Sequence, residues 1–108
     1  MADRLLVQKT AVTDAAGEVV LTGVSGDSQT VISISICETA GADEIFSLVH
    51  CVSGGGSPFN IYKDQPLPAK STFVHPDKIV VDDTDQLMVL MGGACTVHVL
   101  VSYLQQDD

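Results

Sequence analysis

The 108-residue sequence contains no tryptophan, few other aromatic residues and few basic ones. Its longest apolar runs, such as Leu87 to Met91, are far too short for a membrane-spanning helix, so no membrane association is expected. Lysine and arginine total 5 against 14 acidic residues, which gives a formal net charge of -9. Because nucleic-acid binding depends mainly on cations that neutralise phosphates, this balance argues against DNA or RNA as a partner.

The N-terminus and the cysteines both bear on where the chain folds. The opening residues, MADRLLV, lack the extended hydrophobic region and the small-residue cleavage site of a secretory signal. We therefore expect folding in the compartment of synthesis. The three cysteines, Cys37, Cys51 and Cys95, are odd in number, have no C-x-x-C spacing and lie in apolar stretches. They are expected to be reduced and mostly buried, packing as small hydrophobic residues.

The sequence is rich in two-residue alternation, which is typical of half-buried strands. In TVISISICE, residues 30–38, the alternation predicts that Ile32, Ile34 and Ile36 share one face. In residues 94–104, four side chains are expected together on one face: Val97, Val99, Val101 and Tyr103.

Similar runs predict seven further strands, at 4–12, 18–24, 44–52, 58–63, 71–75, 78–82 and 86–91. Eight or nine short strands between turn residues predict an all-β fold. We expect one antiparallel β-sandwich domain of jelly-roll or Ig-like type over residues 1–108, with flexible ends at 1–4 and 105–108.

Three connections can be interpreted from their turn chemistry. The glycines after Met91 favour a tight turn, so 86–91 and 94–104 are expected to pair as a hairpin. SGGGSP, residues 53–58, is expected to join antiparallel strands or to cross between sheets. Pro66 and Pro68 exclude a continuous central strand, because proline has no N–H to donate to a neighbouring strand. They should lie between strands or at an edge.

No catalytic motif in the sequence is complete. GVSGD, residues 23–27, lacks the last glycine of a nucleophile elbow, and SGGGSP lacks the G-K-[ST] of a phosphate loop. The nearest cysteine–histidine pairs, His50 with Cys51 and Cys95 with His98, fall on opposite faces of their strands. The sequence therefore predicts a protein that is not an enzyme, without catalytic residues or a cofactor.

The acidic cluster VDDTDQL offers the best candidates for metal ligands. Asp82, Asp83 and Asp85 have oxygens suited to Ca²⁺, but the glycine and distal glutamate of an EF-hand are missing. Aspartates also stabilise turns through bonds to their own backbone. We therefore interpret the cluster as a hairpin turn between 78–82 and 86–91, with no metal.

The run from Leu87 to Met91 is apolar on both faces, so if Leu87, Val89 and Met91 face the core, Met88 and Leu90 must point outward. A mean hydropathy of +0.29 at a net charge of -9 also suggests more apolar surface than one core needs. We predict that Met88 and Leu90 form a subunit contact; the alternative is coverage by an adjacent loop of the same chain.

A family resemblance adds to this interpretation. The succession IYKDQPLPAKSTFV, KIVVDD, DQLMVL, a glycine turn and TVHVLVSYL resembles the C-terminal half of small virion proteins of tailed bacteriophages. It covers about residues 57–104 and departs from the pattern at SGGGSP and in the cysteines. The matching positions are Tyr62, Lys63, Pro68, Ile79, Asp85, Leu87, Val97, Val99, Val101 and Tyr103.

The resemblance implies a capsid decoration (cement) protein, part of the virion, that is assembled in the cytoplasm of the host bacterium. The leading hypothesis is therefore a homo-oligomer, such as a trimer, that binds the major capsid protein. A head-tail connector, tail or fibre-base accessory protein is the alternative. A carbohydrate-binding module is a third hypothesis, disfavoured because such modules present aromatic platforms and this chain has five aromatic residues: Phe46, Phe59, Tyr62, Phe73 and Tyr103.

Overall fold

The computed structural model describes residues 3–52, 56–82 and 84–107, and within them it shows nine β-strands. No helix in this described part is long and apolar enough to cross a membrane. The predicted all-β sandwich of eight or nine strands is confirmed. The strands are β1 (Asp3–Val12), β2 (Glu18–Thr22), β3 (Asp27–Glu38), β4 (Glu44–Val52), β5 (Gly56–Leu67), β6 (Thr72–His75), β7 (Ile79–Asp82), β8 (Asp85–Met91) and β9 (Val97–Asp107).

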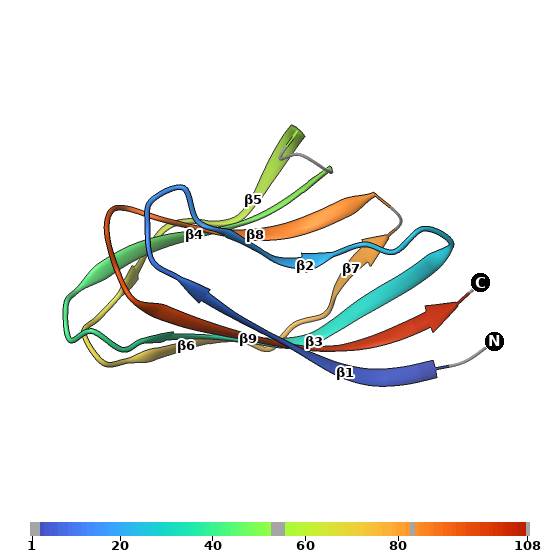
Figure 1. The fold of residues 1–108 in the computed structure, drawn as a ribbon, viewed down its shortest axis with the longest axis horizontal. Coiled ribbons are helices and arrows are strands. Elements are labelled where there is room, and N and C mark those ends of the chain that lie inside the picture. The colour runs from blue at the N-terminus through green and yellow to red at the C-terminus, as the bar shows by residue number, and fades with distance from the viewer. Residues whose placement is uncertain (1–2, 53–55, 83, 108) are drawn as a thin grey trace.

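The strands form two antiparallel sheets that pack face to face (Figure 1). Sheet A has the order β1-β9-β3-β6, and β7 also pairs with β3, beyond the end of β6. Sheet B has the order β2-β8-β4-β5. With β6 and β7 counted as one strand interrupted at Pro76, this is the eight-stranded order of a jelly roll. β1 and β9 extend into the ranges 1–4 and 105–108 for which flexible ends were expected.

The predicted hairpin of 86–91 with 94–104 is wrong. β8 belongs to sheet B and β9 to sheet A, so the glycine-containing segment crosses between the sheets. Two backbone hydrogen bonds fix this crossover: Gly92 N donates to Ile45 O at 3.0 Å, and Cys95 N donates to Thr13 O at 3.2 Å. Glycine allows a tight turn, but these contacts at the ends of β4 and β1 decide where the chain goes.

Two other predicted connections lie partly outside the described residues. The aspartate segment connects β7 of sheet A to β8 of sheet B, so it is a crossover and the predicted hairpin is wrong there too; Asp83 itself is not described. Of SGGGSP, residues 53–55 are not described, and the flanking strands β4 and β5 pair antiparallel. β5 is an edge strand of sheet B, so the prediction that prolines lie at an edge holds for Pro66, although the strand continues through it to Leu67.

The core lies between the sheets and consists mainly of aliphatic side chains. The predicted shared face of the last strand is confirmed: Val97, Val99, Val101 and Tyr103 are all buried and face the core. In β3, Ile34 and Ile36 are buried as expected, but Ile32 is 41% exposed. The register between β3 and β9 shifts between Val31 and Ser33, and this bulge turns Val31 inward in place of Ile32.

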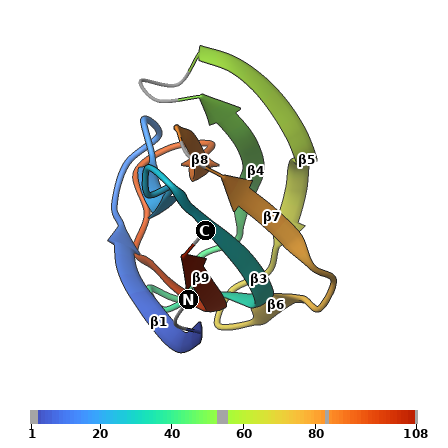
Figure 2. The ribbon, with the colours of Figure 1, turned by 90° about the vertical axis from the view of Figure 1, so that its right-hand side faces the viewer.

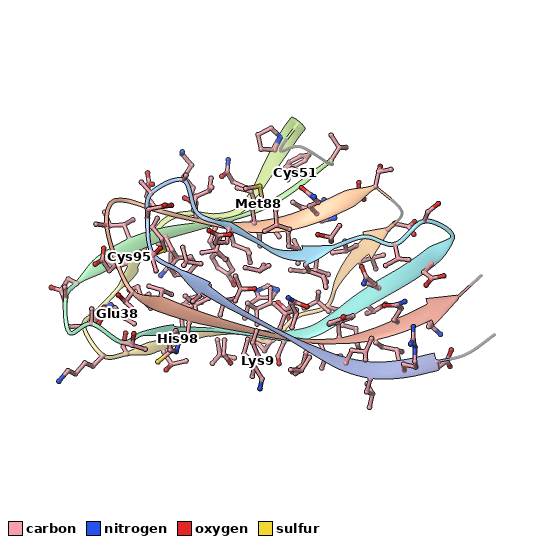
Figure 3. The ribbon with its side chains drawn as sticks, viewed as in Figure 1. Lys9, Glu38, Cys51, Met88, Cys95 and His98 are labelled. Carbon is pink, nitrogen blue, oxygen red and sulfur yellow. The ribbon has the colours of Figure 1, made fainter. Side chains whose placement is uncertain are left out.

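A buried carboxylate, that of Glu38 at the end of β3, holds one end of the sandwich together (Figure 3). Its Oε1 accepts hydrogen bonds from Gly41 N at 2.8 Å, Ala42 N at 3.2 Å and Lys70 N at 3.0 Å, and its Oε2 accepts one from Ala40 N at 2.9 Å. Hydrogen bonds from backbone N–H groups, that of Lys70 first, lower the pKa of Glu38, against the opposing effect of burial.

Glu38→Gln should lower the free energy of unfolding at neutral pH and make it depend less on pH in the acid range. Because the folded-state pKa lies below the ordinary value of 4.5, Glu38 stabilises the fold fully above that value and loses this contribution as the pH falls through the folded-state pKa. Urea unfolding between about pH 7 and about pH 3 measures both effects. Glu18→Gln, at an exposed position on β2, is the matched control. Equal pH dependence in the Glu38→Gln variant and the wild type would contradict the prediction.

Candidate interaction surfaces

The outer face of sheet A exposes six aliphatic side chains, where a solvent-facing sheet normally has polar ones. Their exposed fractions range from 39% for Leu100 to 74% for Leu5. We call them the sheet A face: Leu5 and Val7 of β1, Ile32 of β3, Val74 of β6, Val80 of β7 and Leu100 of β9. This surface could not be predicted from the sequence, because its members come from five strands whose order is not visible there.

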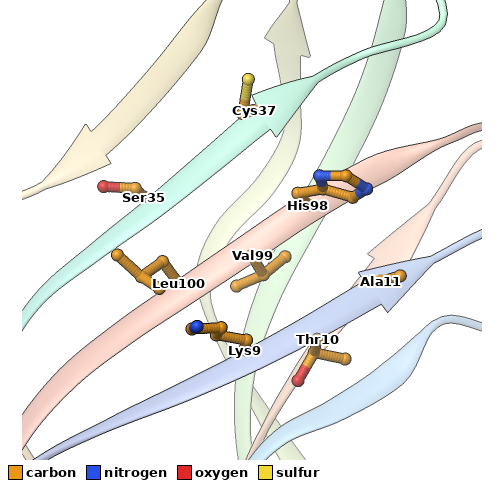
Figure 4. Close-up of a pocket in the computed structure, with 8 residues that line it drawn as sticks. All are labelled: Lys9, Thr10, Ala11, Ser35, Cys37, His98, Val99 and Leu100. Atoms are coloured by element: carbon orange, nitrogen blue, oxygen red, sulfur yellow. The ribbon is translucent and has the colours of Figure 1, made fainter.

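A shallow groove of about 440 Å³ crosses the same side of sheet A (Figure 4). It is lined by residues of β1, β3 and β9: Lys9, Thr10, Ala11, Ser35, Cys37, His98, Val99 and Leu100. Cys37 lies directly opposite His98 in the pairing of β3 with β9. Alternation within one strand cannot reveal such a cross-strand pair. A catalytic cysteine is activated when its thiol hydrogen-bonds to a histidine imidazole. Here the Cys37 thiol is directed instead to the carbonyl oxygen of Glu38, at 3.9 Å.

Met88 and Leu90 lie on the outer face of sheet B, as the alternation of β8 predicted, and their inward neighbours Leu87, Val89 and Met91 are buried (Figure 3). Both outward side chains are half-buried. Met88 faces cross-strand neighbours of its own chain, Val19 and Val49, and Leu90 faces Ser47. Neighbouring strands of the same chain thus provide part of the cover that the alternative interpretation assigned to an adjacent loop. The subunit contact at Met88 and Leu90 stays a prediction.

The three cysteines are free thiols with different exposures. Cys51 is buried, whereas Cys37 and Cys95 are half-buried. Burial raises the pKa of the Cys51 thiol, and the nearby Asp85 carboxylate raises it further. Burial likewise raises the pKa of Cys95, with additional effects from Glu44, Asp14 and Glu38. A raised pKa leaves less of the reactive thiolate, so it lowers the reactivity of Cys51 and of Cys95.

The two described aspartates of the acidic cluster, Asp82 and Asp85, contact separate partners. Asp82 Oδ1 accepts a hydrogen bond from Ser28 Oγ of sheet A at 3.4 Å. Asp85 Oδ2 lies 3.8 Å from His50 Nε2 in sheet B, and that nitrogen is also 3.0 Å from Val80 O. Among residues 3–52, 56–82 and 84–107, no group of three histidine, cysteine, aspartate or glutamate side chains is placed to hold a metal ion.

Most aromatic rings belong to the interior. Phe46, Tyr62 and Phe73 form a cluster in which the centroid of Phe73 lies 5.1 Å from that of Phe46 and 4.9 Å from that of Tyr62. The Tyr62 hydroxyl is hydrogen-bonded to His75 Nδ1 at 2.7 Å, which anchors this cluster to β6. Tyr103 is also buried, whereas Phe59 of β5 is 78% exposed.

No family model and no curated protein matches the sequence. Solved structures do share the fold. A chain of the Bacillus endospore appendages, described as disulfide-linked pili, has a TM-score of 0.55 at 14% identity, over 99% of this chain and 91% of that one. A chain of the T13 particle of infectious bursal disease virus (IBDV) has a TM-score of 0.55 at 11% identity, over 95% of this chain.

A third similar structure is the Eiger TNF of S. frugiperda, with a TM-score of 0.50 at 9% identity, over 96% of this chain and 94% of that one. The present chain spans only 30% of the IBDV chain. At such low identities the three likenesses show a common β-sandwich fold and nothing about what this chain binds.

Brief alkylation of the native protein should modify Cys37 before Cys51. Cys37 is half-exposed on the outer face of sheet A, whereas Cys51 is buried and its thiol pKa is raised. With iodoacetamide at mildly alkaline pH, we expect Cys37 to react about tenfold faster than Cys51, or more. Peptide mass spectrometry at successive times measures the two rates. The urea-unfolded protein is the control, in which the rates should converge. Faster labelling of Cys51 in the native state would contradict the placement of these thiols.

Met88→Asp combined with Leu90→Lys should lower the molar mass of the assembly in solution while the chain stays folded. The inward residues of β8 are unchanged, so each protomer keeps its core, whereas a subunit contact at these positions would acquire two buried charges. Light scattering gives the mass and circular dichroism the fold. An unchanged mass, or unfolding of the variant, would rule out the contact at Met88 and Leu90.

Proposed function

We propose that this chain is a non-enzymatic virion structural protein, a capsid decoration protein that binds the major capsid shell and stabilises it. The observation on which the proposal rests is the sheet A face. Six exposed aliphatic side chains on one side of a small sheet are typical of a surface that a protein partner covers. In this proposal the partner is the major capsid protein, bound on the outside of the particle.

Fold and resemblance support this proposal at different levels. The jelly roll occurs in capsid proteins and in many unrelated proteins, so it is compatible with the role without deciding it. The similarity of residues 57–104 to small virion proteins of tailed bacteriophages favours a phage particle, with synthesis and assembly in the cytoplasm of the host bacterium. In this proposal the protein acts there as a homo-oligomer, such as a trimer, with Met88 and Leu90 at the subunit contact.

A head-tail connector, tail or fibre-base accessory protein is the second candidate, because a small sandwich with an adhesive face serves those positions equally well. The two roles differ in the number of copies in a particle. A shell protein is present on the order of hundreds of times, whereas a connector or tail ring has about six or twelve copies, following its rotational symmetry. Quantitative mass spectrometry of purified particles distinguishes them.

The placement of the aromatic rings favours a protein partner over a sugar. Carbohydrate-binding modules stack exposed rings on sugar faces, but Phe46 and Tyr103 are buried and Tyr62 and Phe73 pack against the core. Phe59, on the edge strand β5, stays exposed. A single exposed ring at a sheet edge gives a small platform compared with the aliphatic surface on the other sheet.

Ile32→Ser combined with Leu100→Ser should weaken binding to particles about tenfold or more. Both side chains belong to the sheet A face and are partly exposed, so the change removes apolar contact area while leaving the core intact. Co-sedimentation with particles stripped of this protein measures the binding. Ile45→Ser with Val52→Ser, at aliphatic positions of sheet B that are 47% and 42% exposed, is the matched control. Equal binding by both variants would refute the role of the sheet A face.

A further inference from the structure

The four sheet edges are protected to different degrees, and β1 is the least protected. Unpaired edge strands invite pairing with another chain unless prolines, bulges, short length or charged side chains that the other chain cannot neutralise prevent it. β5 contains Pro58 and Pro66 and has three register shifts, and β2 is five residues long with a shift between Val19 and Leu21. On the other edge of sheet A, β6 and β7 have four residues each.

β1, in contrast, is a long and regular edge. Its ten residues pair with β9 from Asp3 to Val12 without a register shift, and they include neither proline nor glycine. Figure 2 shows β1 at the margin of sheet A, on the side of the molecule opposite β5. Leu5 is 74% and Val7 48% exposed, and Leu6 is half-buried between them. The strand therefore presents both free backbone groups and apolar side chains.

We propose that β1 pairs antiparallel with β1 of a second copy of this chain, about a two-fold axis at Leu6. In this register Asp3 faces Lys9 of the other copy and Leu5 faces Val7, both on the outer face of the sheet. On the inner face Arg4 is opposite Gln8, and Leu6 is opposite Leu6. Each charge thus meets an opposite charge or a neutral polar group, and each aliphatic side chain meets another, which is the pattern that stabilises cross-strand pairs.

Neighbouring registers lack this complementarity. Because side chains alternate, only shifts by two residues keep the same face outward in both copies. A shift in one direction places Arg4 opposite Leu6 and Asp3 opposite Val7. A shift in the other direction places Leu5 opposite Lys9.

The same features identify the occupant as a second copy. The chain has a net charge of -9, yet β1 contains two of its five basic residues, Arg4 and Lys9, beside the single acidic residue Asp3. In an antiparallel pair of two β1 strands, the acidic end of each strand lies opposite the basic Lys9 of the other. The resulting contact is isologous, in which one surface serves both partners, and this is the commonest symmetry of homo-oligomers.

Disulfide trapping tests the register directly. In the proposed pairing, Leu6→Cys places two thiols opposite each other on the two-fold axis, within the reach of a disulfide. Gln8→Cys is the control on the same face of the same strand, since two residues at position 8 would lie about 13 Å apart, four residues along the strand. After mild oxidation, Leu6→Cys should give a covalent dimer on a non-reducing gel, whereas Gln8→Cys and the wild type should not.

Charge exchange tests the same pairing without new thiols. Asp3→Lys alone and Lys9→Asp alone each place like charges opposite each other twice in the dimer. Each should raise its dissociation constant about tenfold, and the double variant should restore it to within about threefold. Sedimentation over a concentration series measures these values, and circular dichroism confirms that each variant is folded.

Each outcome decides for or against the proposal. A covalent dimer with Leu6→Cys alone, together with rescue by the double charge exchange, supports it. Equal or absent cross-linking of Leu6→Cys and Gln8→Cys, no rescue, or a wild-type chain that stays monomeric over the whole series overturns it. If the wild-type chain stays monomeric, the strand that pairs with β1 would have to come from another protein. The test is independent of the proposed capsid role, because it requires no particle.

Discussion

The carboxylate of Glu38 is the constraint on which the arrangement of the two sheets depends. A buried ionised carboxylate is costly unless hydrogen bonds replace its water, and here four backbone N–H groups do so. Three belong to the segment that leads from β3 to β4, and one to the turn that leads from β5 to β6. One side chain therefore holds two crossovers between the sheets, and the left-handed backbone of Gly41 and Lys70 brings their N–H groups to it.

The crossovers in turn create the surfaces that we propose for binding. Because most consecutive strands belong to different sheets, the strands that lie side by side in sheet A are far apart in the sequence, as β1 and β9 are. The sheet A face and the groove beside it thus combine side chains from both ends and the middle of the chain. β1 becomes an edge for the same reason: β2, its neighbour in sequence, belongs to the other sheet.

The existence of the nine strands could be predicted because alternation is a local property of each run. Their ends follow less closely: β5 (Gly56–Leu67) extends beyond the predicted 58–63, and β9 begins at Val97 instead of 94. Pairing is not local. The glycines after Met91 have the chemistry of a hairpin turn, yet hydrogen bonds to Ile45 and Thr13 lead the chain to the other sheet. A single extra residue in β3 likewise exchanges the roles of Val31 and Ile32, and no feature of the isoleucine pattern announces that bulge.

For the candidate surfaces too, features set by alternation within one strand could be predicted, whereas features set by the strand order could not. The outward position of Met88 and Leu90 follows from alternation within β8 and could be predicted, but the cover that Val19 and Val49 give to Met88 requires the strand order. The opposition of Cys37 to His98 and the sheet A face also depend on that order, so they were invisible in the sequence. Glu38 left one local signal: it occupies the inward position that follows Ile34 and Ile36, where an acidic residue is out of place unless hydrogen bonds satisfy it.

Pairing through β1 and binding through the sheet A face would reinforce each other. Leu5 and Val7 belong to both surfaces: their backbone lies at the edge of the sheet and their side chains point to its outer face. In the two-fold pair, Leu5 of one copy adjoins Val7 of the other, so the aliphatic surface would continue without interruption from one protomer to the next. Two linked copies then present two binding faces in a fixed relation, and the second face binds with a high effective concentration once the first is bound. A weak contact by one small domain would thereby become a stable attachment to a repeating surface.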